Sequence, residues 1–377
     1  MLRWGMVGGG EGSQIGPAHR LAARLDGLFA FEAGALDHVP ERGREYGARL
    51  GLRPERAYGD WQEMLANERV REDRPHLVTV ATPNNTHYAI ALAFLEAGFD
   101  VLLEKPMTTT VAEGEALVAA ARDAGRILAV NYGYTGYPLV RHMRAMVARG
   151  DLGRVRLVVA EFAHGHHADA AQAKNPRVRW RYDPAQMGAS AQFADCGIHA
   201  AHMARFILNS PISRISADFV SGIETRTLED DAQANLRFAN GAAGRLWTSA
   251  IAAGHMHGLA IQVFGERGGM AWAQEQPNQL HWTPVGGRTS TIERGEMGLS
   301  PEHDRATRVT IGHAEGMTLA FANIYGDLAE QITARMDGRA ADPAATLAPT
   351  GEEGLESVRL IGAAVESARD EGRWVSL

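Results

Sequence analysis

Short apolar runs alternate with helix-like segments through the first 135 residues, and this alternation restricts the fold more than any other feature of the sequence. The longer segments repeat apolar residues at helical spacing, whereas the short runs read as buried strands. Strands that alternate with helices of this length form right-handed βαβ units and therefore a parallel sheet. We predict an α/β domain over residues 1–135. Its expected strands are residues 2–7, 31–37, 76–83, 100–106 and 126–132, and its expected helices are 17–25, 40–52, 87–98 and 110–125.

The pattern changes after residue 135. An amphipathic helix is expected from Tyr137 to Gly150, and alternating runs bounded by turns such as "ANG" and "ERGG" then follow. Such alternation is typical of antiparallel strands. We therefore expect residues 136–377 to form an α+β domain with a mainly antiparallel sheet. Its expected strands lie within residues 154–165, 212–222, 230–252 and 259–274, and further helices are expected at 196–208, 317–337 and 351–370.

Charge and composition argue against several classes of function. The net charge of −7 gives no basic footprint for nucleic acid or an anionic membrane. The sequence has no apolar run of about 18 residues that could span a bilayer, and its first residues lack a signal-peptide pattern. Cys196 is the only cysteine, so an internal disulfide is excluded. We expect a cytoplasmic protein that acts on a small molecule and has no nucleic-acid or membrane partner.

Glycines gather directly after the first expected strand, in "GMVGGGEGSQIGPAHR". Glycine loses more conformational freedom on folding than any other residue, so the cluster indicates that something approaches the backbone closely. A loop of this kind between a strand and a helix points N–H groups at an anion. Gly8 and Gly10 fit the first two glycines of a dinucleotide fingerprint. The third position of a strict fingerprint falls on Ser13, and Gly16 takes that role if residues 11–13 are an insertion. A tight structural turn is the alternative.

Asp37 ends the second expected strand. A carboxylate at that position accepts both ribose hydroxyls of a dinucleotide and repels a 2′-phosphate, which favours NAD over NADP. Arg42 lies close in the sequence and leaves NADP open.

Two further motifs carry groups suited to acid–base chemistry. Lys105 in "LLEKP" ends the fourth expected strand, at the sheet edge where doubly wound folds bind ligands, although a solvated charge is the alternative. Asp195 and His199 in "FADCGIH" are four residues apart, so on a helix they share a face. A carboxylate beside an imidazole selects its tautomer, as an acid–base pair requires. A capping aspartate and a packed histidine are the alternative, and His202 lies on the same side.

These motifs resemble the Gfo/Idh/MocA oxidoreductases, the family of glucose–fructose oxidoreductase and inositol dehydrogenase. The resemblance rests on "GMVGGG", "IGPAHR", "ATPNNTHY", "EKP" and "DCGIH" and covers nearly the whole chain. "YTGYPLVR", "WRYDP", "VFGERGGMAW" and "GHAEGMTLAFANIY" resemble the branch that contains levoglucosan dehydrogenase and the L-glucose and scyllo-inositol dehydrogenases. The resemblance implies an N-terminal Rossmann domain, a C-terminal domain with a large open sheet, and hydride transfer between NAD(P) and a cyclic sugar or polyol.

The resemblance also implies that Lys105, Asp195 and His199 are the catalytic residues. His199 is expected to take the hydroxyl proton, Lys105 to stabilise the developing alkoxide, and Asp195 to orient the imidazole. The cofactor-binding residues expected are Gly8, Gly10, Gly12, Ile15, Gly16, Asp37, Arg42, Thr82, Pro83, Asn84, His87, Glu104 and Lys105.

The chain departs from the family pattern after its first antiparallel strand. Where the family has a Gln and a Trp, this chain has "HGHHAD", with His164, His166 and His167. No cysteine or paired carboxylate accompanies them at convincing ligand spacing, so altered substrate contacts are favoured and no metal is predicted. Polar, planar side chains suit vicinal hydroxyls, although a loop-structural role is the alternative for several of them. The expected substrate contacts are Lys105, Tyr134, His164, Arg181, Asp183, Asp195, His199 and His313.

The predicted function is NAD-dependent oxidation of a secondary hydroxyl in a cyclic sugar, anhydrosugar or inositol. Two alternatives stay open: a glycoside-cleaving enzyme that uses transient oxidation and elimination, and a non-enzymatic NAD-binding regulator. The joint presence of Lys105, Asp195 and His199 argues against the regulator. The antiparallel sheet offers a face that one helix layer does not cover, so we expect a homodimer or homotetramer built by sheet contact.

Overall fold

The computed structural model describes residues 1–377, apart from the side chains of residues 173, 174, 176 and 177. The chain forms two compact units. The first combines Met1–Gly136 with Met317–Leu355, and the second combines Tyr137–Gly316 with Glu356–Leu377. The assignment of cofactor binding to residues 1–135, and of substrate binding and oligomer contacts to 136–377, stays a prediction.

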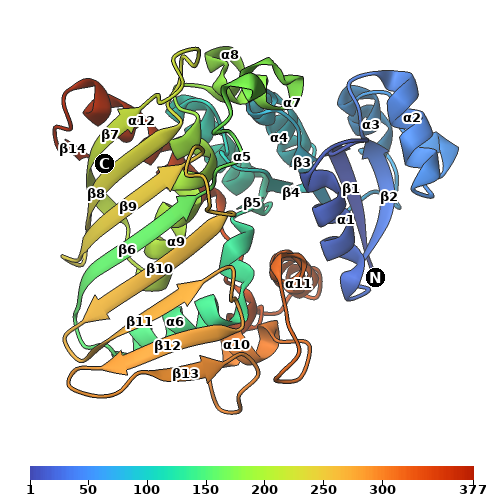
Figure 1. Ribbon diagram of the computed structural model, residues 1–377. Coiled ribbons are helices and arrows are strands. Elements are labelled where there is room, and N and C mark those ends of the chain that lie inside the picture. The colour runs from blue at the N-terminus through green and yellow to red at the C-terminus, as the bar shows by residue number, and fades with distance from the viewer. The chain divides into compact units, whose positions relative to one another are not determined.

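The first unit contains a five-stranded parallel sheet in the order β2-β1-β3-β4-β5 (Figure 1). The predicted α/β class and parallel sheet are confirmed. The strands are β1 (Leu2–Gly8), β2 (Phe29–Ala35), β3 (Leu77–Ala81), β4 (Asp100–Leu103) and β5 (Leu128–Val130). The helices are α1 (Ile15–Leu25), α2 (Pro40–Arg49), α3 (Trp61–Glu68), α4 (His87–Glu96), α5 (Val111–Ala124) and α11 (Met317–Met336), with short turns η1 (Pro54–Arg56), η2 (Asn84–Thr86), η3 (Gly133–Gly136) and η7 (Pro343–Ala345).

The core of the first unit needs the late segment of the chain. Trp4 and Phe29 from the sheet pack in one buried cluster with Tyr325 and Leu328 of α11. The aromatic rings meet edge to face, with centroids 5.9 Å apart for Trp4–Tyr325 and 5.8 Å apart for Phe29–Tyr325. A helix at residues 317–337 was predicted, but its place in this core was not.

Two boundaries in the first unit differ from the sequence-based expectation. β2 ends at Ala35, so Asp37 lies two residues beyond the strand and not at its last position. α1 begins at Ile15, two residues before Pro17, because the proline is tolerated within the first turn of a helix. The sequence analysis also missed α3, whose start is capped by Asp60 through a 2.7 Å hydrogen bond from the amide of Glu63.

The second unit is built on a nine-stranded sheet in the order β13-β12-β11-β10-β6-β9-β8-β7-β14 (Figure 1). The strand pairs are antiparallel except for β6 and β9, so the predicted mainly antiparallel sheet is confirmed. The strands are β6 (Val155–Ala163), β7 (Ile212–Val220), β8 (Asp231–Phe238), β9 (Ala243–Ser249), β10 (Gly258–Gly265), β11 (Gly268–Ala273), β12 (Gln279–Pro284), β13 (Ser290–Glu293) and β14 (Val375–Ser376).

Helices cover one face of this sheet. α6 and α9 lie behind it in Figure 1, and the predicted end of α6 at Gly150 is confirmed by a left-handed cap with φ of 79°. The sequence analysis missed α7, α8, α10 and the strands from β12 onward. The helical elements are α6 (Pro138–Arg149), α7 (Pro176–Arg179), α8 (Pro184–Met187), a π-helical turn η6 (Phe193–Gly197), α9 (Ile198–Leu208), α10 (Pro301–Ala306) and most of α12 (Gly351–Arg369), with turns η4 (Ala170–Lys174) and η5 (Trp180–Tyr182).

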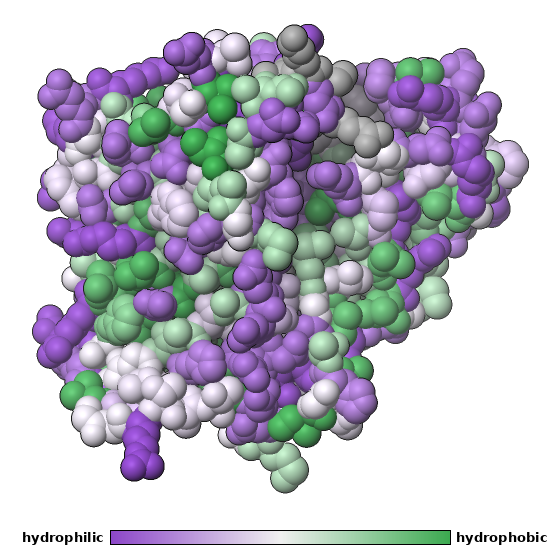
Figure 2. Space-filling view, in the orientation of Figure 1, coloured by the Kyte–Doolittle hydropathy of each residue, from purple (hydrophilic) through white to green (hydrophobic). Residues whose placement is uncertain are grey.

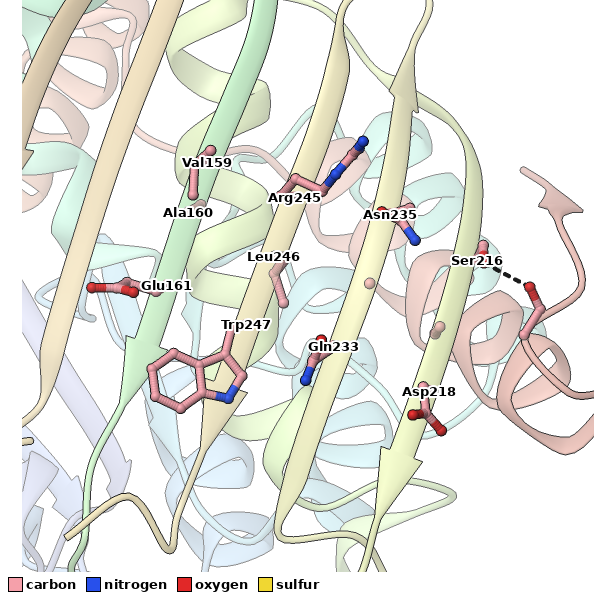
Figure 3. A pocket seen from close by; sticks show the side chains of 13 residues that line it. Val159, Ala160, Glu161, Ser216, Asp218, Gln233, Asn235, Arg245, Leu246 and Trp247 are labelled. Atoms are coloured by element: carbon pink, nitrogen blue, oxygen red, sulfur yellow. Dashed lines mark hydrogen bonds between the residues drawn. The ribbon is translucent and has the colours of Figure 1, made fainter.

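The opposite face of the sheet is exposed. Figure 2 shows hydrophobic side chains gathered on part of this face. Phe264 of β10 is 39% exposed, and Val159 of β6 is half-buried. A shallow hollow of about 280 Å³ crosses β6, β9, β8 and β7, with Trp247 and Arg245 projecting into it (Figure 3). Among the described residues, we find no helix with both the length and the apolar character needed to cross a membrane.

Candidate active site

The glycine loop after β1 turns sharply at three glycines. Gly8, Gly9 and Gly12 have φ of 80°, 65° and 81°, a backbone region that L side chains rarely adopt. A Cβ on Gly8 would also collide with the carbonyl oxygen of Ala81, because β1 and β3 pair closely there. Space around a Cβ on Gly12 is open, so this glycine serves the turn and not a close contact.

Two other glycines allow close packing of the loop. A Cβ on Gly10 would strike the carbonyl oxygen of Leu36, and one on Gly16 would strike the carbonyl oxygen of Gly9. Gly16 therefore brings helix α1 against the loop, which is the part played by the third glycine in a dinucleotide fingerprint. The alternative placement of that role at Ser13 is not supported, because Ser13 uses its hydroxyl to accept the amide of Gly16 at 3.1 Å.

Asp37 lies beside this loop and carries an ion pair. Its Oδ1 accepts Arg42 Nη2 at 2.6 Å and the amide of Val39 at 2.9 Å, while its Oδ2 lies 3.6 Å from a Cβ built on Gly10. Partial burial raises the pKa of Asp37, but the hydrogen bonds from Arg42 and Val39 outweigh it and leave the pKa below its usual value. The carboxylate is ionised at neutral pH and is close to the loop.

The loop, the start of α1 and Asp37 fit a dinucleotide. Ile15 is the first residue of α1, so the helix N-terminus faces the end of the loop and offers amides for a pyrophosphate. The open space around Gly12 leaves room for such a group, and Asp37 supplies the carboxylate that a ribose diol needs.

The residues predicted after β3 occupy different environments. Pro83 is exposed and Thr82 is half-buried, whereas Asn84 and His87 are buried. His87 bridges two segments: its Nδ1 lies 2.9 Å from the carbonyl oxygen of Pro106, and its Nε2 lies 2.9 Å from that of Thr82. Its ring therefore ties the segment after β3 to the segment after β4.

Lys105 is half-buried and follows Glu104 directly after β4. The buried Glu104 carboxylate accepts a hydrogen bond from the Lys105 amide at 3.2 Å through Oε2. Its other oxygen, Oε1, accepts hydrogen bonds from His19 Nε2 at 2.9 Å and from Asn131 Nδ2 at 2.6 Å. Burial raises the pKa of Glu104, but the hydrogen bond from His19 and the charge of Lys105 bring it to about 2. The Lys105–Pro106 bond is cis.

Asp195 and His199 occupy consecutive elements of the second unit. Asp195 lies in the π-helical turn η6 and His199 in α9, so the two residues do not belong to one regular α-helix, and their shared face stays a prediction. A π-turn widens the helix and alters where side chains project, and such turns are frequent at functional sites. Asp195 Oδ2 lies 3.5 Å from Arg181 Nε, and the His199 ring packs 6.0 Å from Phe162.

Glu229 caps the start of this helical segment. Its Oε1 accepts the Ser190 hydroxyl at 2.6 Å and the amides of Ala191 and Phe193 at 2.9 and 3.0 Å. The sequence analysis considered Asp195 as the cap and missed Glu229, which is supplied by the segment before β8. Burial raises the pKa of Glu229 above its ordinary value, and these hydrogen bonds partly offset that effect.

A cluster of imidazole rings lies near Asp195. The His164 ring centroid is 5.2 Å from that of His166 and 5.0 Å from that of His257, and His166 and His257 are 4.6 Å apart. His167 also contacts this group, with its ring centroid 5.4 Å from His164. The sequence analysis missed His257, which belongs to a "GHMHG" turn before β10 that repeats the composition of the "HGHH" stretch.

Two of these histidines are held neutral. Burial, together with the other imidazoles, lowers the pKa of His164 to about 3. Burial and the charges of Arg181 and Arg226 lower the pKa of His167 to about 4, although Asp195 acts in the opposite direction. His164 and His167 form a wall of imidazole rings beside Asp195, and this wall therefore offers uncharged donors and acceptors at neutral pH.

The other predicted substrate contacts lie in several places. Asp183 caps α8, accepting the amide of Ala185 at 3.0 Å and Gln186 Nε2 at 2.8 Å. His313 is exposed, with Nδ1 3.2 Å from Thr310 Oγ1. Tyr134 is half-buried in η3 of the first unit. Two other predicted contacts lie near Asp195: Arg181 through the 3.5 Å contact, and His164 close enough for the Asp195 charge to act on its imidazole.

Within the described residues, no three His, Cys, Asp or Glu side chains are grouped so that they could hold a metal ion.

Comparison with known proteins identifies the family and the fold. Residues 2–132 match the oxidoreductase family with an NAD-binding Rossmann fold, and residues 140–271 match the Gfo/Idh/MocA C-terminal domain. Crystal structures of an inositol dehydrogenase homolog from Azotobacter vinelandii, complexed with NAD+ and with NADH and myo-inositol, share 40% and 39% identity with the chain. Their TM-scores are 0.95 and 0.92, and each comparison covers 100% of this chain and 97% of that one.

Two curated relatives extend over the same length. An uncharacterised oxidoreductase of Bacillus subtilis is 37% identical, covering 99% of this chain and 96% of its own. The levoglucosan dehydrogenase of Pseudarthrobacter phenanthrenivorans is 25% identical, covering 100% and 98%. The chain belongs to the Gfo/Idh/MocA family of oxidoreductases, and its N-terminal part has that family's NAD-binding Rossmann fold.

Proposed function

We propose that this oxidoreductase is an NAD-dependent dehydrogenase that oxidises a secondary hydroxyl of a cyclic sugar, anhydrosugar or inositol. The observation that carries the substrate class is the neutral imidazole wall beside Asp195. The pKa values of about 3 and 4 leave His164 and His167 uncharged at neutral pH. Such a wall suits a polyol, whose hydroxyls need neutral donors and acceptors, better than an anionic substrate. The myo-inositol complex of the Azotobacter homolog and the levoglucosan dehydrogenase relative support the same class.

Three side chains share the proposed chemistry. His199 accepts the proton of the reacting hydroxyl, and Asp195 orients its imidazole. Lys105 donates to the reacting oxygen and stabilises the negative charge that develops there. NAD, when bound, takes the hydride from the carbon, so the C–H and O–H bonds break as the C=O bond forms. The glycine loop, Asp37 and the start of α1 hold the dinucleotide.

The test is a substrate panel followed by the appearance of NADH. Inositols, D- and L-sugars, levoglucosan and simple glycosides are incubated with purified protein and NAD, and products are identified by mass. We expect stoichiometric NADH and ketone from at least one free polyol or anhydrosugar. Glycoside cleavage without net NADH would instead identify the eliminating enzyme. NAD binding without turnover of any compound would favour the regulator.

Variants separate binding from chemistry in the same assay. Lys105→Ala and His199→Asn are expected to lower kcat by roughly 100-fold or more, because each removes a group that acts on the reacting oxygen. NADH binding by His199→Asn should stay within about twofold of the parent, since the dinucleotide contacts lie elsewhere in the proposal. Unchanged turnover by Lys105→Ala would refute the catalytic role proposed for Lys105.

The proposal includes assembly as a homodimer or homotetramer through the exposed face of the nine-stranded sheet. Phe264 is 39% exposed on that face, and the half-buried Val159 and Trp247 line its hollow, and exposed apolar groups of this kind mark interaction surfaces. Phe264→Glu should shift the sedimentation coefficient toward the monomer. Val70→Glu, at a residue that is 77% exposed after α3, is the control and should leave the assembly intact. Sedimentation of the parent as a monomer would refute this part of the proposal.

A further inference from the structure

A continuous chain of buried hydrogen bonds runs through the core of the first unit to Glu104. Trp4 Nε1 lies 2.9 Å from Thr79 Oγ1, and Thr79 Oγ1 lies 2.9 Å from the Tyr325 hydroxyl. The same hydroxyl lies 2.9 Å from His19 Nδ1, and His19 Nε2 lies 2.9 Å from Glu104 Oε1. All five side chains are buried, and they come from β1, β3, α11, α1 and the segment after β4.

The two ends of the chain restrict the directions of its hydrogen bonds. The Trp4 indole can only donate, and the Glu104 carboxylate, with a pKa of about 2, can only accept. With a neutral His19 imidazole, one arrangement satisfies every group: Thr79 donates to Tyr325, Tyr325 donates to His19 Nδ1, and His19 donates from Nε2 to Glu104. Aligned bonds of this kind strengthen one another.

The Glu104 carboxylate connects the chain of hydrogen bonds to the backbone of Lys105. Glu104 Oε2 accepts the Lys105 amide at 3.2 Å, while Oε1 is held by both His19 and Asn131. A shift of the His19 ring would rotate the carboxylate and move the backbone from which the lysine side chain extends. The chain therefore ends on the main chain of a residue to which the proposed function gives a catalytic role.

The same helix also holds the glycine loop. Arg20, the neighbour of His19 on α1, donates from Nη1 to the carbonyl oxygen of Gly9 at 2.6 Å. Gly16 on the first turn of α1 packs directly on Gly9. One rigid helix thus contacts the loop through Gly16 and Arg20, and the lysine segment through His19.

We propose that His19, held by Tyr325, is a positioning residue that fixes Lys105 relative to the dinucleotide loop. This inference rests on the proposed function for the role of Lys105. His19 and Tyr325 act through Glu104 and are not catalytic residues. Their effect on turnover comes from the placement of the lysine main chain.

The experiment breaks the chain at successive points. Thr79→Val, Tyr325→Phe and His19→Ala remove links at increasing closeness to Glu104. We expect kcat to fall by roughly 3-fold, 10-fold and 100-fold in that order, because small displacements of a catalytic group already cost up to about 100-fold. His19→Gln places an amide N–H where Nε2 donates to Glu104, so it should recover part of the activity that His19→Ala loses. The Kd for NADH should change less than about twofold in Thr79→Val and Tyr325→Phe.

A second readout needs neither substrate nor cofactor. Amide hydrogen exchange at Lys105 in the purified protein reports the bond to Glu104 directly. We expect exchange at this amide to accelerate more in Tyr325→Phe than exchange at the core amides of β1 and β3, which report only the loss of global stability. Because this measurement is independent of turnover, a wild-type protein inactive on every polyol would overturn the proposed function without deciding the positioning role.

Tyr58→Phe is the matched control. Tyr58 is another buried tyrosine of the first unit, and its hydroxyl donates to a carboxylate, Glu68, at 2.8 Å. Tyr58→Phe should lower Tm in the same range as Tyr325→Phe without changing kcat or Lys105 exchange. The positioning role is refuted if kcat losses follow the losses in Tm and not the order along the chain, or if the Lys105 amide exchanges at the wild-type rate in Tyr325→Phe. Should Tyr325→Phe fail to fold, Thr79→Val and His19→Gln carry the same comparison.

Discussion

The Glu229 carboxylate accepts the backbone amide of Phe193 at 3.0 Å, and it thereby caps the helical segment that carries Asp195 and His199. Glu229→Ala should lower the free energy of unfolding by about 2 kcal/mol, because buried amides lose their acceptor. It should also lower kcat while the Kd for NADH is kept. Glu229→Gln retains an oxygen acceptor and should preserve most of both properties. Chemical unfolding and steady-state kinetics check this, and equal damage from the two variants would contradict the capping role.

The raised pKa of Glu229 gives this comparison a pH dependence. The folded state binds the proton more tightly than the unfolded state, so the contribution of Glu229 to stability decreases as pH rises from the ordinary glutamate value to the raised one. Glu229→Gln has no such titration and should show a flatter profile of unfolding free energy across that interval.

Asp37 and Arg42 are expected to decide the choice of dinucleotide. Replacing Asp37 by Ser removes the carboxylate that repels a 2′-phosphate and releases Arg42 from its 2.6 Å ion pair. The ratio of kcat/KM with NADP to that with NAD should rise by roughly tenfold or more. In the double variant with Arg42→Ala, the gain with NADP should disappear. A gain that persists without Arg42 would show that this arginine does not receive the phosphate.

Gly10 and Gly12 should respond differently to alanine. A Cβ on Gly10 would collide with the backbone of Leu36, so Gly10→Ala must displace the loop and should raise the Kd for NADH by roughly tenfold or more. Gly12→Ala meets open space and suffers only the left-handed backbone, which costs about 1–2 kcal/mol of stability. Titration calorimetry and thermal unfolding distinguish the two, and tighter NADH binding by Gly10→Ala than by Gly12→Ala would contradict this assignment.

Buried histidines should make the protein less stable in mild acid. Burial, aided by the charge of Arg149, lowers the pKa of His142 to about 4. The unfolded state takes up a proton below about pH 6.5 and the folded state does not, so stability is present above pH 6.5 and is lost toward pH 4. His142→Asn should reduce the slope of unfolding free energy against pH in this window by up to about 1.4 kcal/mol per pH unit.

The fold was largely predictable because period and turn chemistry are local. The helix from Pro138 ends at Gly150 as predicted, since a glycine there can adopt the left-handed cap. The destination of α11 was not predictable, because a helical period identifies an apolar face but not the surface on which it packs. Nothing in the sequence singled out Tyr325, although its hydroxyl is a link to His19.

The proposed site was predictable where one short motif carried it and not where strand pairing assembled it. His164 stood out in "HGHH", but His257 is 93 positions away, and only the antiparallel register that pairs Gly258 with Ala163 brings the two rings together. The spacing of Asp195 and His199 indicated a helix, yet the π-turn depends on contacts that i, i+4 reasoning does not include.

The return of Met317–Leu355 to the first unit sets the order in which this protein can be made. During synthesis, β1 leaves the ribosome some 300 residues before the helix that completes its core, as the positions of Trp4 and Tyr325 show. The nascent Rossmann segment therefore exposes apolar surface while the following sheet is translated, a situation in which chaperones protect growing chains. A gene fragment that stops at Gly136 would encode this incomplete core and not a free-standing nucleotide-binding module.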